Sequence, residues 1–323
     1  MPMVKIGLFG AGHLGKIHLK CLQQTQGLFE ITGFYEPDAD TARAVSETFG
    51  LRAFDQAEDL MARCDAIDIV SPTTTHYALA MQALEHNCHL FIEKPVTRKL
   101  QEAAELLQKS REKNRIVQVG HVERFNPALL SLEQEQVNPR FIEAHRLAGF
   151  NPRSTDVSVV LDLMIHDLDI VHFLVGAPLR EIRAHGVPIV SHTADICNAR
   201  LEFENGCVAN LTASRISLKQ MRKMRIFQSN AYLSIDFLEK KSQIVRLLDA
   251  DSGAIGLPLD TPNGQKIIQI SQPQAKPVNA IQMELESFAK SILHNAPIAV
   301  PLEDGYQALK TAEAIEEMIE QGE

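Results

Sequence analysis

The stretch Ile6-Gly7-Leu8-Phe9-Gly10-Ala11-Gly12-His13-Leu14-Gly15 decides the fold of this 323-residue chain. A short apolar strand runs directly into Gly-x-Gly-x-x-Gly, and a helical pattern follows from Lys16 to Gln24. In this motif the first glycine permits a tight turn, the second lets the backbone approach a pyrophosphate, and the third lets helix and strand pack closely. The order of strand, glycine loop and helix predicts a dinucleotide-binding site. A glycine turn that binds nothing is the alternative.

An acidic residue follows the second strand at the position where ribose hydroxyls are usually bound. The apolar strand Ile31–Tyr35 ends at Glu36, about 20 positions after the glycines. A carboxylate there repels the 2′-phosphate of NADP, so NAD is the expected cofactor and NADP the less favoured one. The cofactor contacts predicted from these two segments are Gly10, Gly12, His13, Leu14, Gly15 and Glu36.

The pattern of elements predicts two domains of different architecture. Up to Gly120, apolar strands alternate with helices, which is typical of a doubly wound parallel sheet in an α/β protein. Beyond it, a helix Pro127–Glu135 and a helix near Val159–Leu174 are expected, followed by successive strands with short turns. Consecutive strands predict an α+β domain with a large, mostly antiparallel open sheet. We expect an NAD-binding domain over residues 1–122 and a substrate-binding and oligomerisation domain over 123–323.

Two further expectations concern the end of the chain and the large sheet. The C-terminal helix is a candidate to pack back on the first domain, and the polar, Pro-containing segment Asn263–Lys276 is expected to be a mobile loop. Apolar residues fall on both faces of the predicted sheet, for example Val208 and Leu211. A homo-oligomer, dimer or tetramer, formed through that sheet is the expected consequence.

Composition excludes several classes of protein. A formal net charge of −9 argues against general nucleic-acid binding, and no apolar run approaches the length needed to span a membrane. The five cysteines lack Cys-x-x-Cys spacing, so neither a disulfide framework nor a metal site is indicated. The first strand begins near Val4, which leaves no room for a signal peptide, and a reducing cytoplasmic location is expected.

The first candidate catalytic group is a lysine at the end of a parallel strand. Glu93-Lys94-Pro95 follows the apolar strand His89–Ile92, and doubly wound sheets bind ligands at the carboxyl ends of their strands. A lysine there can hydrogen-bond a substrate hydroxyl and stabilise a developing alkoxide. A solvated lysine in a loop is the alternative.

A second candidate group is a carboxylate and an imidazole on one helical face. Asp162 and His166 are four residues apart within an otherwise apolar segment. Histidine suits general-base catalysis because its ordinary pKa of about 6.5 is close to working pH. A purely structural His–Asp hydrogen bond is the alternative, and a metal site is disfavoured because no third ligand is apparent.

These features in this order resemble the glucose–fructose oxidoreductase / inositol dehydrogenase / rhizopine catabolism (Gfo/Idh/MocA) family over nearly the whole chain. The segments that carry the resemblance are the glycine motif, Glu93-Lys94-Pro95, Gly120-His121-x-x-Arg124-Phe125-Asn126-Pro127 and Asp162-x-x-x-His166. It implies a Rossmann domain, an α/β domain with an open sheet, and catalysis in the cleft between them. The catalytic trio would be Lys94, Asp162 and His166.

The resemblance also implies further cofactor contacts. Glu93 and Lys94 would lie at the nicotinamide end, and His76 would lie along the cofactor from the preceding turn. That turn is Ser71-Pro72-Thr73 where the family often has Thr-Pro-Asn, and the Thr73 hydroxyl can still hydrogen-bond.

Within the family, the segments 120–127 and 156–176 resemble nucleotide-sugar 3-dehydrogenases. This likeness implies an NAD-dependent oxidoreductase that transfers a hydride from C3 of a UDP-N-acetyl sugar to NAD. An inositol or free-sugar dehydrogenase is the alternative enzyme, and a non-catalytic NAD-binding regulator is the alternative of another class. The substrate-binding candidates are Lys94, Arg124, Asn126, Asp162, His166 and Arg222.

One charge pattern agrees with an anionic substrate. From Asn205 through Ile235 there is no acidic residue, yet five basic residues occur there: Arg215, Lys219, Arg222, Lys223 and Arg225. A basic segment in an acidic chain favours a ligand such as a diphosphate. A strand face paired with acids elsewhere is the alternative, as is a helix-capping turn for Arg124 and Asn126.

Overall fold

The computed structural model describes residues 2–150, 157–262 and 264–322. The chain forms two compact units. Unit 1 comprises Met1–Phe125 and Asn279–Leu309, and unit 2 comprises Asn126–Val278 and Lys310–Glu323. The units therefore do not follow chain order, because a late segment joins the N-terminal unit and the chain then returns to unit 2.

Unit 1 is built on a six-stranded parallel sheet in the order β3-β2-β1-β4-β5-β6. The strands are β1 (Val4–Phe9), β2 (Phe29–Tyr35), β3 (Ala53–Phe54), β4 (Ala66–Ile69), β5 (His89–Glu93) and β6 (Val117–Gly120). The helices of this unit include α1 (His13–Gln24), α2 (Ala39–Phe49), α3 (Ala57–Met61), α4 (Thr73–Glu85), α5 (Leu100–Lys113), the 3-10 helix η1 (Val122–Phe125) and α8 (Ala280–His294). The strand order reverses between β1 and β4, which confirms the predicted doubly wound sheet.

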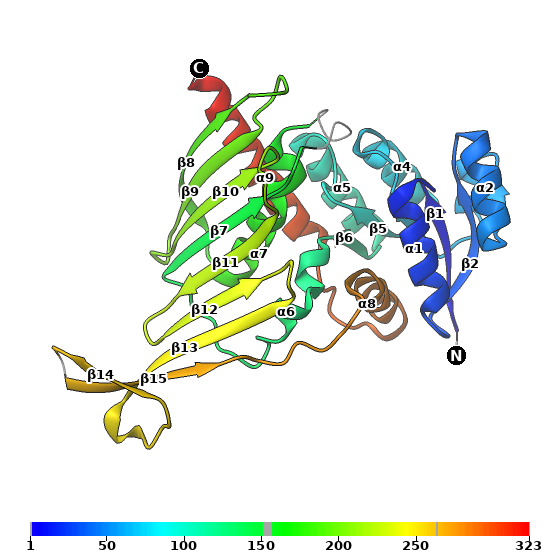
Figure 1. The fold of residues 1–323 in the computed structure, drawn as a ribbon. Helices are drawn as coiled ribbons and strands as arrows, with labels where there is room; N and C mark the ends of the chain where they lie inside the picture. Colours follow the sequence, from blue (N-terminus) through cyan, green and yellow to red (C-terminus); the bar gives the residue numbers. More distant parts are fainter. Residues whose placement is uncertain (1, 151–156, 263, 323) are drawn as a thin grey trace. The chain divides into compact units, whose positions relative to one another are not determined.

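Burial explains why the sequence pattern was readable in unit 1. All four residues of β4 are buried, and Ile6, Leu8 and Phe9 of β1 are fully buried. Strands covered by helices on both faces read as continuous apolar runs. Helices α1 and α8 pack side by side, as do α4 and α5 (Figure 1). Residues of α8 contribute to the core around β1, where the Phe288 and Phe91 rings meet edge to face.

Unit 2 is built on a nine-stranded sheet in the order β14-β15-β13-β12-β11-β7-β10-β9-β8. Every neighbouring pair is antiparallel except β7 and β10, so the predicted, mostly antiparallel open sheet is confirmed. The strands are β7 (Phe141–Leu147), β8 (Leu179–Val187), β9 (Ile196–Phe203), β10 (Val208–Ser214), β11 (Met221–Phe227), β12 (Ala231–Asp236), β13 (Lys241–Asp249), β14 (Leu257–Thr261) and β15 (Gly264–Ser271). Between β13 and β14 lies the 3-10 helix η4 (Ala250–Ser252).

Helices cover one face of this sheet. They are α6 (Pro127–Leu130), the π-helical segment η3 (Val160–Met164), α7 (Ile165–Val175) and the C-terminal part of α9 (Leu302–Gln321). Along β7, Ile142, Ala144 and Arg146 are buried while the residues between them are only half-buried. This period of two places the buried residues on the helix-covered face and the others on the open face.

Two sequence expectations need correction. Helix α6 ends at Leu130 and not at Glu135, because a run of turns bonded three residues apart replaces the helix from Ser131 onward. The expected mobile loop Asn263–Lys276 contains β15, whose main chain pairs with both β13 and β14; Asn263 itself lies outside the described residues. Its sequence looked like a loop because much of the segment is polar and it contains prolines.

Three further elements, β3, α3 and β14, were not expected, because strands and helices this short show no measurable periodicity. Among the residues described, no helix has the length and apolar character that crossing a membrane requires.

Candidate functional site

The glycine loop of unit 1 has the geometry that a bound dinucleotide requires. Gly10 has φ of 89°, and a Cβ atom there would lie 2.5 Å from the Cα of Ser71. A Cβ on Gly15 would lie 2.0 Å from the carbonyl oxygen of Gly10. A Cβ on Gly12 would meet no atom within 4 Å. The outer glycines are therefore needed for packing, whereas Gly12 faces open space where a pyrophosphate can approach.

The start of α1 offers main-chain N–H groups to an anion. Gly12 is the N-cap residue, and neither a side-chain cap nor an acidic residue occupies the first turn. The first N–H groups of a helix have no intrahelical acceptor and carry the positive end of its dipole. Gly12, His13 and Leu14 are all exposed. The residues present thus fit the diphosphate of a nicotinamide dinucleotide.

Glu36 follows β2 and lies beside the glycine loop. Its Oε2 accepts a hydrogen bond of 2.8 Å from the Ala11 N–H, and its Oε1 accepts one of 3.1 Å from the Asp38 N–H. These contacts fix the carboxylate next to the turn that carries Gly10 and Gly12. A half-buried, oriented carboxylate at this edge can accept hydrogen bonds from a ribose diol.

His76 connects the two turns that follow β4 and β5. Its Nε2 lies 2.8 Å from the Ser71 carbonyl oxygen, and its Nδ1 lies 3.0 Å from the Pro95 carbonyl oxygen. Burial lowers the pKa of His76, and a neutral ring can donate to only one of these carbonyls at a time. The structure therefore gives His76 a role in holding the Ser71 turn beside Pro95. Thr73, half-buried, is the first residue of α4.

Lys94 is the half-buried residue directly after β5, and its main chain is held by Glu93. The Lys94 N–H donates a hydrogen bond of 3.1 Å to Oε2 of Glu93. The other oxygen, Oε1, lies 3.3 Å from Nε2 of His18, a fully buried residue of α1. Burial opposes ionisation of Glu93, but the hydrogen bond and charge of His18 together with the charge of Lys94 hold its pKa below the ordinary value.

In unit 2, Asp162 and His166 lie where the π-helical segment joins α7. Both are half-buried, whereas the intervening Met164 and Ile165 are buried. A π-helical turn inside a helix is rare and occurs frequently at functional sites. The first turn of α7 is fastened to the sheet by Asp167, which forms two hydrogen bonds of 3.0 and 2.8 Å with the buried guanidinium of Arg146.

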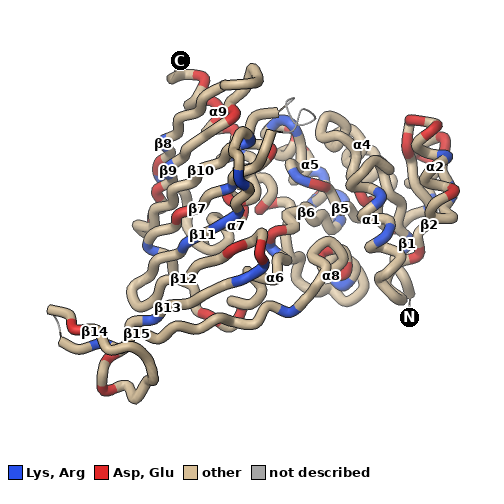
Figure 2. The backbone as a smooth tube through the Cα atoms, viewed as in Figure 1, with Lys and Arg blue, Asp and Glu red and all other residues tan. Residues whose placement is uncertain are grey.

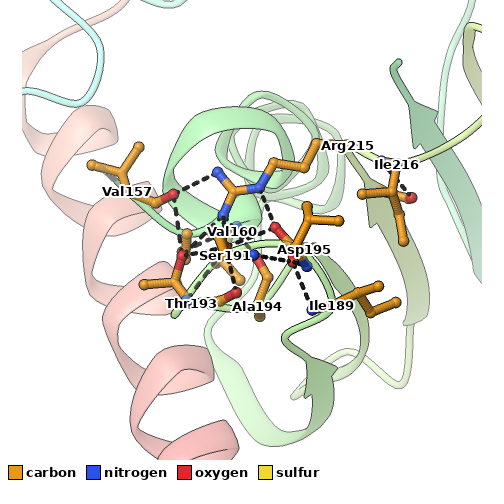
Figure 3. Close-up of polar contacts among 12 residues, drawn as sticks. Val157, Val160, Ile189, Ser191, Thr193, Ala194, Asp195, Arg215 and Ile216 are labelled. Carbon is orange, nitrogen blue, oxygen red and sulfur yellow. Dashed lines mark hydrogen bonds and ion pairs between the residues drawn. The ribbon is translucent and has the colours of Figure 1, made fainter. Parts of the chain in front are cut away.

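Arg215, the first basic residue of the segment 205–235, holds the chain that leads into the helical segment η3–α7. Its Nε donates to Oδ1 of Asp195 at 2.9 Å, and its other nitrogens donate to Val157, Ser191, Thr193 and Ala194 (Figure 3). The guanidinium is buried and surrounded by protein acceptors. Arg215 is thus a structural anchor, because its donors face this loop.

Three of the remaining basic residues of the segment lie on β11 (Figure 2), and successive residues of a strand point to opposite faces of the sheet. Lys223 pairs with Asp236 at 3.1 Å, and Arg225 pairs with Glu143. For these two, the alternative of a strand face paired with acids is the observed one. Arg222 lies opposite Arg146 in the register of β11 and β7. Directly opposed residues share a face, so Arg222 is on the helix-covered face with Met224 and Ile226.

The two polar residues near the end of η1 make structural contacts. Arg124 of unit 1 donates to Oδ2 of Asp304 at 3.0 Å. Asn126 of unit 2 caps α6 through a 3.0 Å bond from the Ala128 N–H, and its Nδ2 donates to the Phe237 carbonyl oxygen. Asn126 therefore has the capping role that the residue before Pro127 also allowed.

The structure brings the unit 1 candidates together at the carboxyl ends of neighbouring strands β2, β1, β4 and β5. Asp162, His166 and Arg222 belong to the helix-covered side of the unit 2 sheet. Sequence reasoning missed His18 and Asp195, each of which contacts a site segment through the fold. His18 is one turn after Gly15 on α1, and no local pattern distinguishes it from any other buried histidine.

Two protein-family models match the chain. A model described as an oxidoreductase family with an NAD-binding Rossmann fold matches residues 4–121. A model described as the C-terminal alpha/beta domain of the oxidoreductase family matches residues 151–323.

Individual relatives agree with these models. UDP-N-acetylglucosamine 3-dehydrogenase of Acidithiobacillus ferrooxidans is 36% identical over 299 residues, which cover 92% of this chain and 91% of the relative. A crystal structure of that enzyme aligns over 99% of both chains with a TM-score of 0.89 and 33% identity. Inositol 2-dehydrogenase/D-chiro-inositol 3-dehydrogenase of Shouchella clausii is 26% identical over 99% of this chain and 92% of its own length.

A more distant structure shares the fold. Scyllo-inositol dehydrogenase from Lactobacillus casei, solved with bound NAD(H) and scyllo-inositol, aligns with a TM-score of 0.79 at 21% identity. The alignment covers 100% of this chain and 98% of that one.

Proposed function

We propose a specific reaction for this chain, which belongs to the oxidoreductase family with an NAD-binding Rossmann fold and a C-terminal alpha/beta domain: it oxidises the C3 hydroxyl of a UDP-N-acetyl sugar with NAD. The observation that carries the proposal is the likeness to UDP-N-acetylglucosamine 3-dehydrogenase over more than nine-tenths of both chains. Lys94, Asp162 and His166 supply the groups that such a reaction needs.

The cofactor would be held by the unit 1 residues described above. The N–H groups at the start of α1 would bind the diphosphate, with Gly12 allowing close approach, and Glu36 would accept hydrogen bonds from the ribose. The nicotinamide of a bound NAD supplies an acceptor for the hydride. The carboxylate of Glu36 favours NAD over NADP because it repels a 2′-phosphate.

The side chains of the trio have distinct roles in alcohol oxidation. His166 removes the hydroxyl proton, since a neutral imidazole is a base near working pH. The Lys94 ammonium group hydrogen-bonds the same oxygen and stabilises the negative charge that develops on it. Asp162 orients the reacting groups. Holding the reactants in contact contributes roughly 7–11 kcal/mol toward lowering the barrier.

A screen for NADH formation tests the reaction. The purified protein is assayed spectrophotometrically with NAD and separate UDP-sugars, free sugars and inositols, with a ketone trap because alcohol oxidation by NAD is often uphill. Oxidation of a UDP-N-acetyl sugar is expected. Turnover of inositols or free sugars alone would favour the second candidate enzyme, which the Shouchella clausii relative supports. No turnover with any substrate, together with tight NAD binding, would favour a non-catalytic regulator.

We further propose that the open face of the unit 2 sheet forms a homo-oligomer. This face carries the half-buried Phe141 and Tyr232 and the exposed Phe227, whose rings pack on one another. Aromatic side chains gathered on an open sheet face are typical of a protein–protein interface. Sedimentation velocity should report a dimer or tetramer, and replacing Phe227 with Glu should shift the protein toward monomer.

The proposed location is a reducing cytoplasm. The five cysteines are all free thiols, which fits that compartment.

A further inference from the structure

A group of four ionisable side chains is buried inside unit 1, directly behind Glu93. His18 comes from α1, Asp68 from β4, Glu93 from β5 and Glu284 from α8, and none is more than 8% exposed. Nδ1 of His18 lies 2.9 Å from Asp68, and Nε2 lies 3.3 Å from Glu93. One ring nitrogen of His18 and one carboxyl oxygen each of Glu93 and Glu284 all lie within 4.8 Å of one another.

With His18 protonated and all three carboxyl groups ionised, this cluster carries two excess negative charges. Three carboxylates face a single imidazolium, and both carboxyl oxygens of Glu284 are buried without a hydrogen-bond partner within the described residues. A buried carboxylate that lacks a partner is strongly disfavoured. Two carboxyl groups that share a site do not both ionise readily. A proton on Glu284 leaves the cluster with one negative charge in place of two.

The surroundings determine which carboxyl group takes the proton. Burial, then the charge of Glu93, raises the pKa of Glu284 well above its ordinary range. The pKa of His18 is raised because its contacts with Asp68 and Glu93 outweigh burial. Burial also raises the pKa of Asp68. The other polar groups nearby are Gln118, whose Nε2 donates to the main-chain oxygen of Glu284, and Cys21, which contacts Asn279.

We infer that Glu284 is a positioning residue: its protonated carboxyl group lets Glu93 stay ionised against His18, and Glu93 in turn fixes the main chain of Lys94. This inference rests on the proposed function, in which Lys94 meets the substrate. The carboxylate of Glu93 has little room to move, because a Cβ on Gly120 would lie only 2.7 Å from its Oε1. A second full charge on Glu284 would repel Glu93 from the place where it accepts the Lys94 N–H.

Activity measurements with two replacements of Glu284 test the positioning role. Glu284→Gln keeps the shape and neutral charge of the protonated acid, so kcat at neutral pH should stay within about threefold of the parent. Glu284→Ala removes the group and leaves a cavity, and its kcat should fall at least about tenfold (roughly 1.4 kcal/mol) while NAD affinity changes less. If kcat is retained with Gln but lost with Ala, the site needs the shape of the neutral acid and not a negative charge at position 284. Parent-like kcat in Glu284→Ala, or a tenfold loss in Glu284→Gln, overturns the inference.

The pH dependence of thermal unfolding tests the proton independently of turnover. A carboxyl group whose pKa is raised by folding stabilises the protein at low pH, and this contribution is lost as pH rises above its unfolded pKa. Between pH 5 and pH 8, the Tm of the parent should therefore fall relative to that of Glu284→Gln, by at least about 2 °C. Glu286→Gln is the matched control, because Glu286 lies on the same helix but its carboxylate accepts a hydrogen bond from Nε2 of Gln282. Its Tm should follow the parent.

Two results of this second experiment would overturn the inference. One is a parallel pH dependence in the parent and in Glu284→Gln, which would mean that Glu284 holds no extra proton. The other is one equivalent of a divalent metal in the purified parent, with EDTA lowering the Tm of the parent but not of Glu284→Gln; a cation would then balance the cluster. Because the Tm measurements need no substrate, they test the proton on Glu284 separately from the proposed sugar oxidation.

Discussion

Nε of Arg215 lies 2.9 Å from Oδ1 of Asp195, and this buried ion pair holds the segment that leads into η3 and α7. The same guanidinium donates to the Val157 carbonyl oxygen at 2.7 Å. The second oxygen of Asp195 accepts three main-chain N–H groups, from Ile189, Val190 and Ser191. Two segments distant in sequence are thus tied to the start of the helical segment that carries Asp162 and His166.

We predict that Asp195→Asn destabilises unit 2. Removing one partner of a buried ion pair typically costs 3–5 kcal/mol, because the other charge stays buried. Denaturant unfolding should show this loss. Arg183→Gln is a suitable control, since Arg183 forms an exposed pair with Glu181 and exposed pairs contribute little. An unchanged unfolding midpoint in Asp195→Asn would mean that the pair does not anchor the segment.

The same pair predicts a loss of stability in acid. Burial opposes ionisation of Asp195, but the hydrogen bonds from the three N–H groups lower its pKa below the ordinary value. The stabilising contribution is complete above the unfolded pKa and disappears as pH falls toward the folded pKa. The difference in Tm between the parent and Asp195→Asn should therefore shrink between pH 5 and pH 3. A Tm difference that stays constant over this range would contradict the claim that the ionised carboxylate of Asp195 stabilises the fold.

Lys94→Ala and His166→Ala should each lower kcat while NAD still binds. General-base groups typically contribute 10²–10⁴-fold, so a loss of this order is expected for His166→Ala. Lys94 is held by its main chain through Glu93, so the alanine replacement removes the ammonium group without removing that hydrogen bond. Steady-state kinetics give kcat, and fluorescence titration gives the affinity for NAD. A variant with normal turnover would remove that residue from the mechanism.

Much of the architecture could be predicted from the sequence, because buried parallel strands are apolar runs and the glycine loop has a fixed chemistry. Strand β15 could not be predicted, since it pairs with β13 and β14 through main-chain hydrogen bonds, which its polar side chains do not reveal. The role of Arg215 was also hidden. Only the folded sheet brings it to Asp195, whereas in sequence it is one of several basic residues.

Glu36 is predicted to determine the choice of cofactor. Replacing it with Ser removes the charge that would repel a 2′-phosphate, and like charges placed together cost several kcal/mol. The ratio of kcat/KM with NADP to that with NAD should rise at least about tenfold. Because Glu36 also accepts the Ala11 N–H, activity with NAD should fall in the same variant. A ratio that does not change would show that another group excludes the phosphate.

Arg222 and Arg225 provide a matched pair for testing the diphosphate of the proposed substrate. Arg222 shares the helix-covered face with Arg146, whereas Arg225 lies on the opposite face and pairs with Glu143. A hydrogen bond to a charged group contributes about 1.5–3 kcal/mol. Arg222→Ala should therefore raise KM for a UDP-sugar by about tenfold or more, and Arg225→Ala should leave it unchanged. An equal effect of both replacements would mean that general charge, and not a specific contact, attracts the substrate. If the protein oxidises inositols with the same KM before and after Arg222→Ala, the loss belongs to the nucleotide part of the substrate.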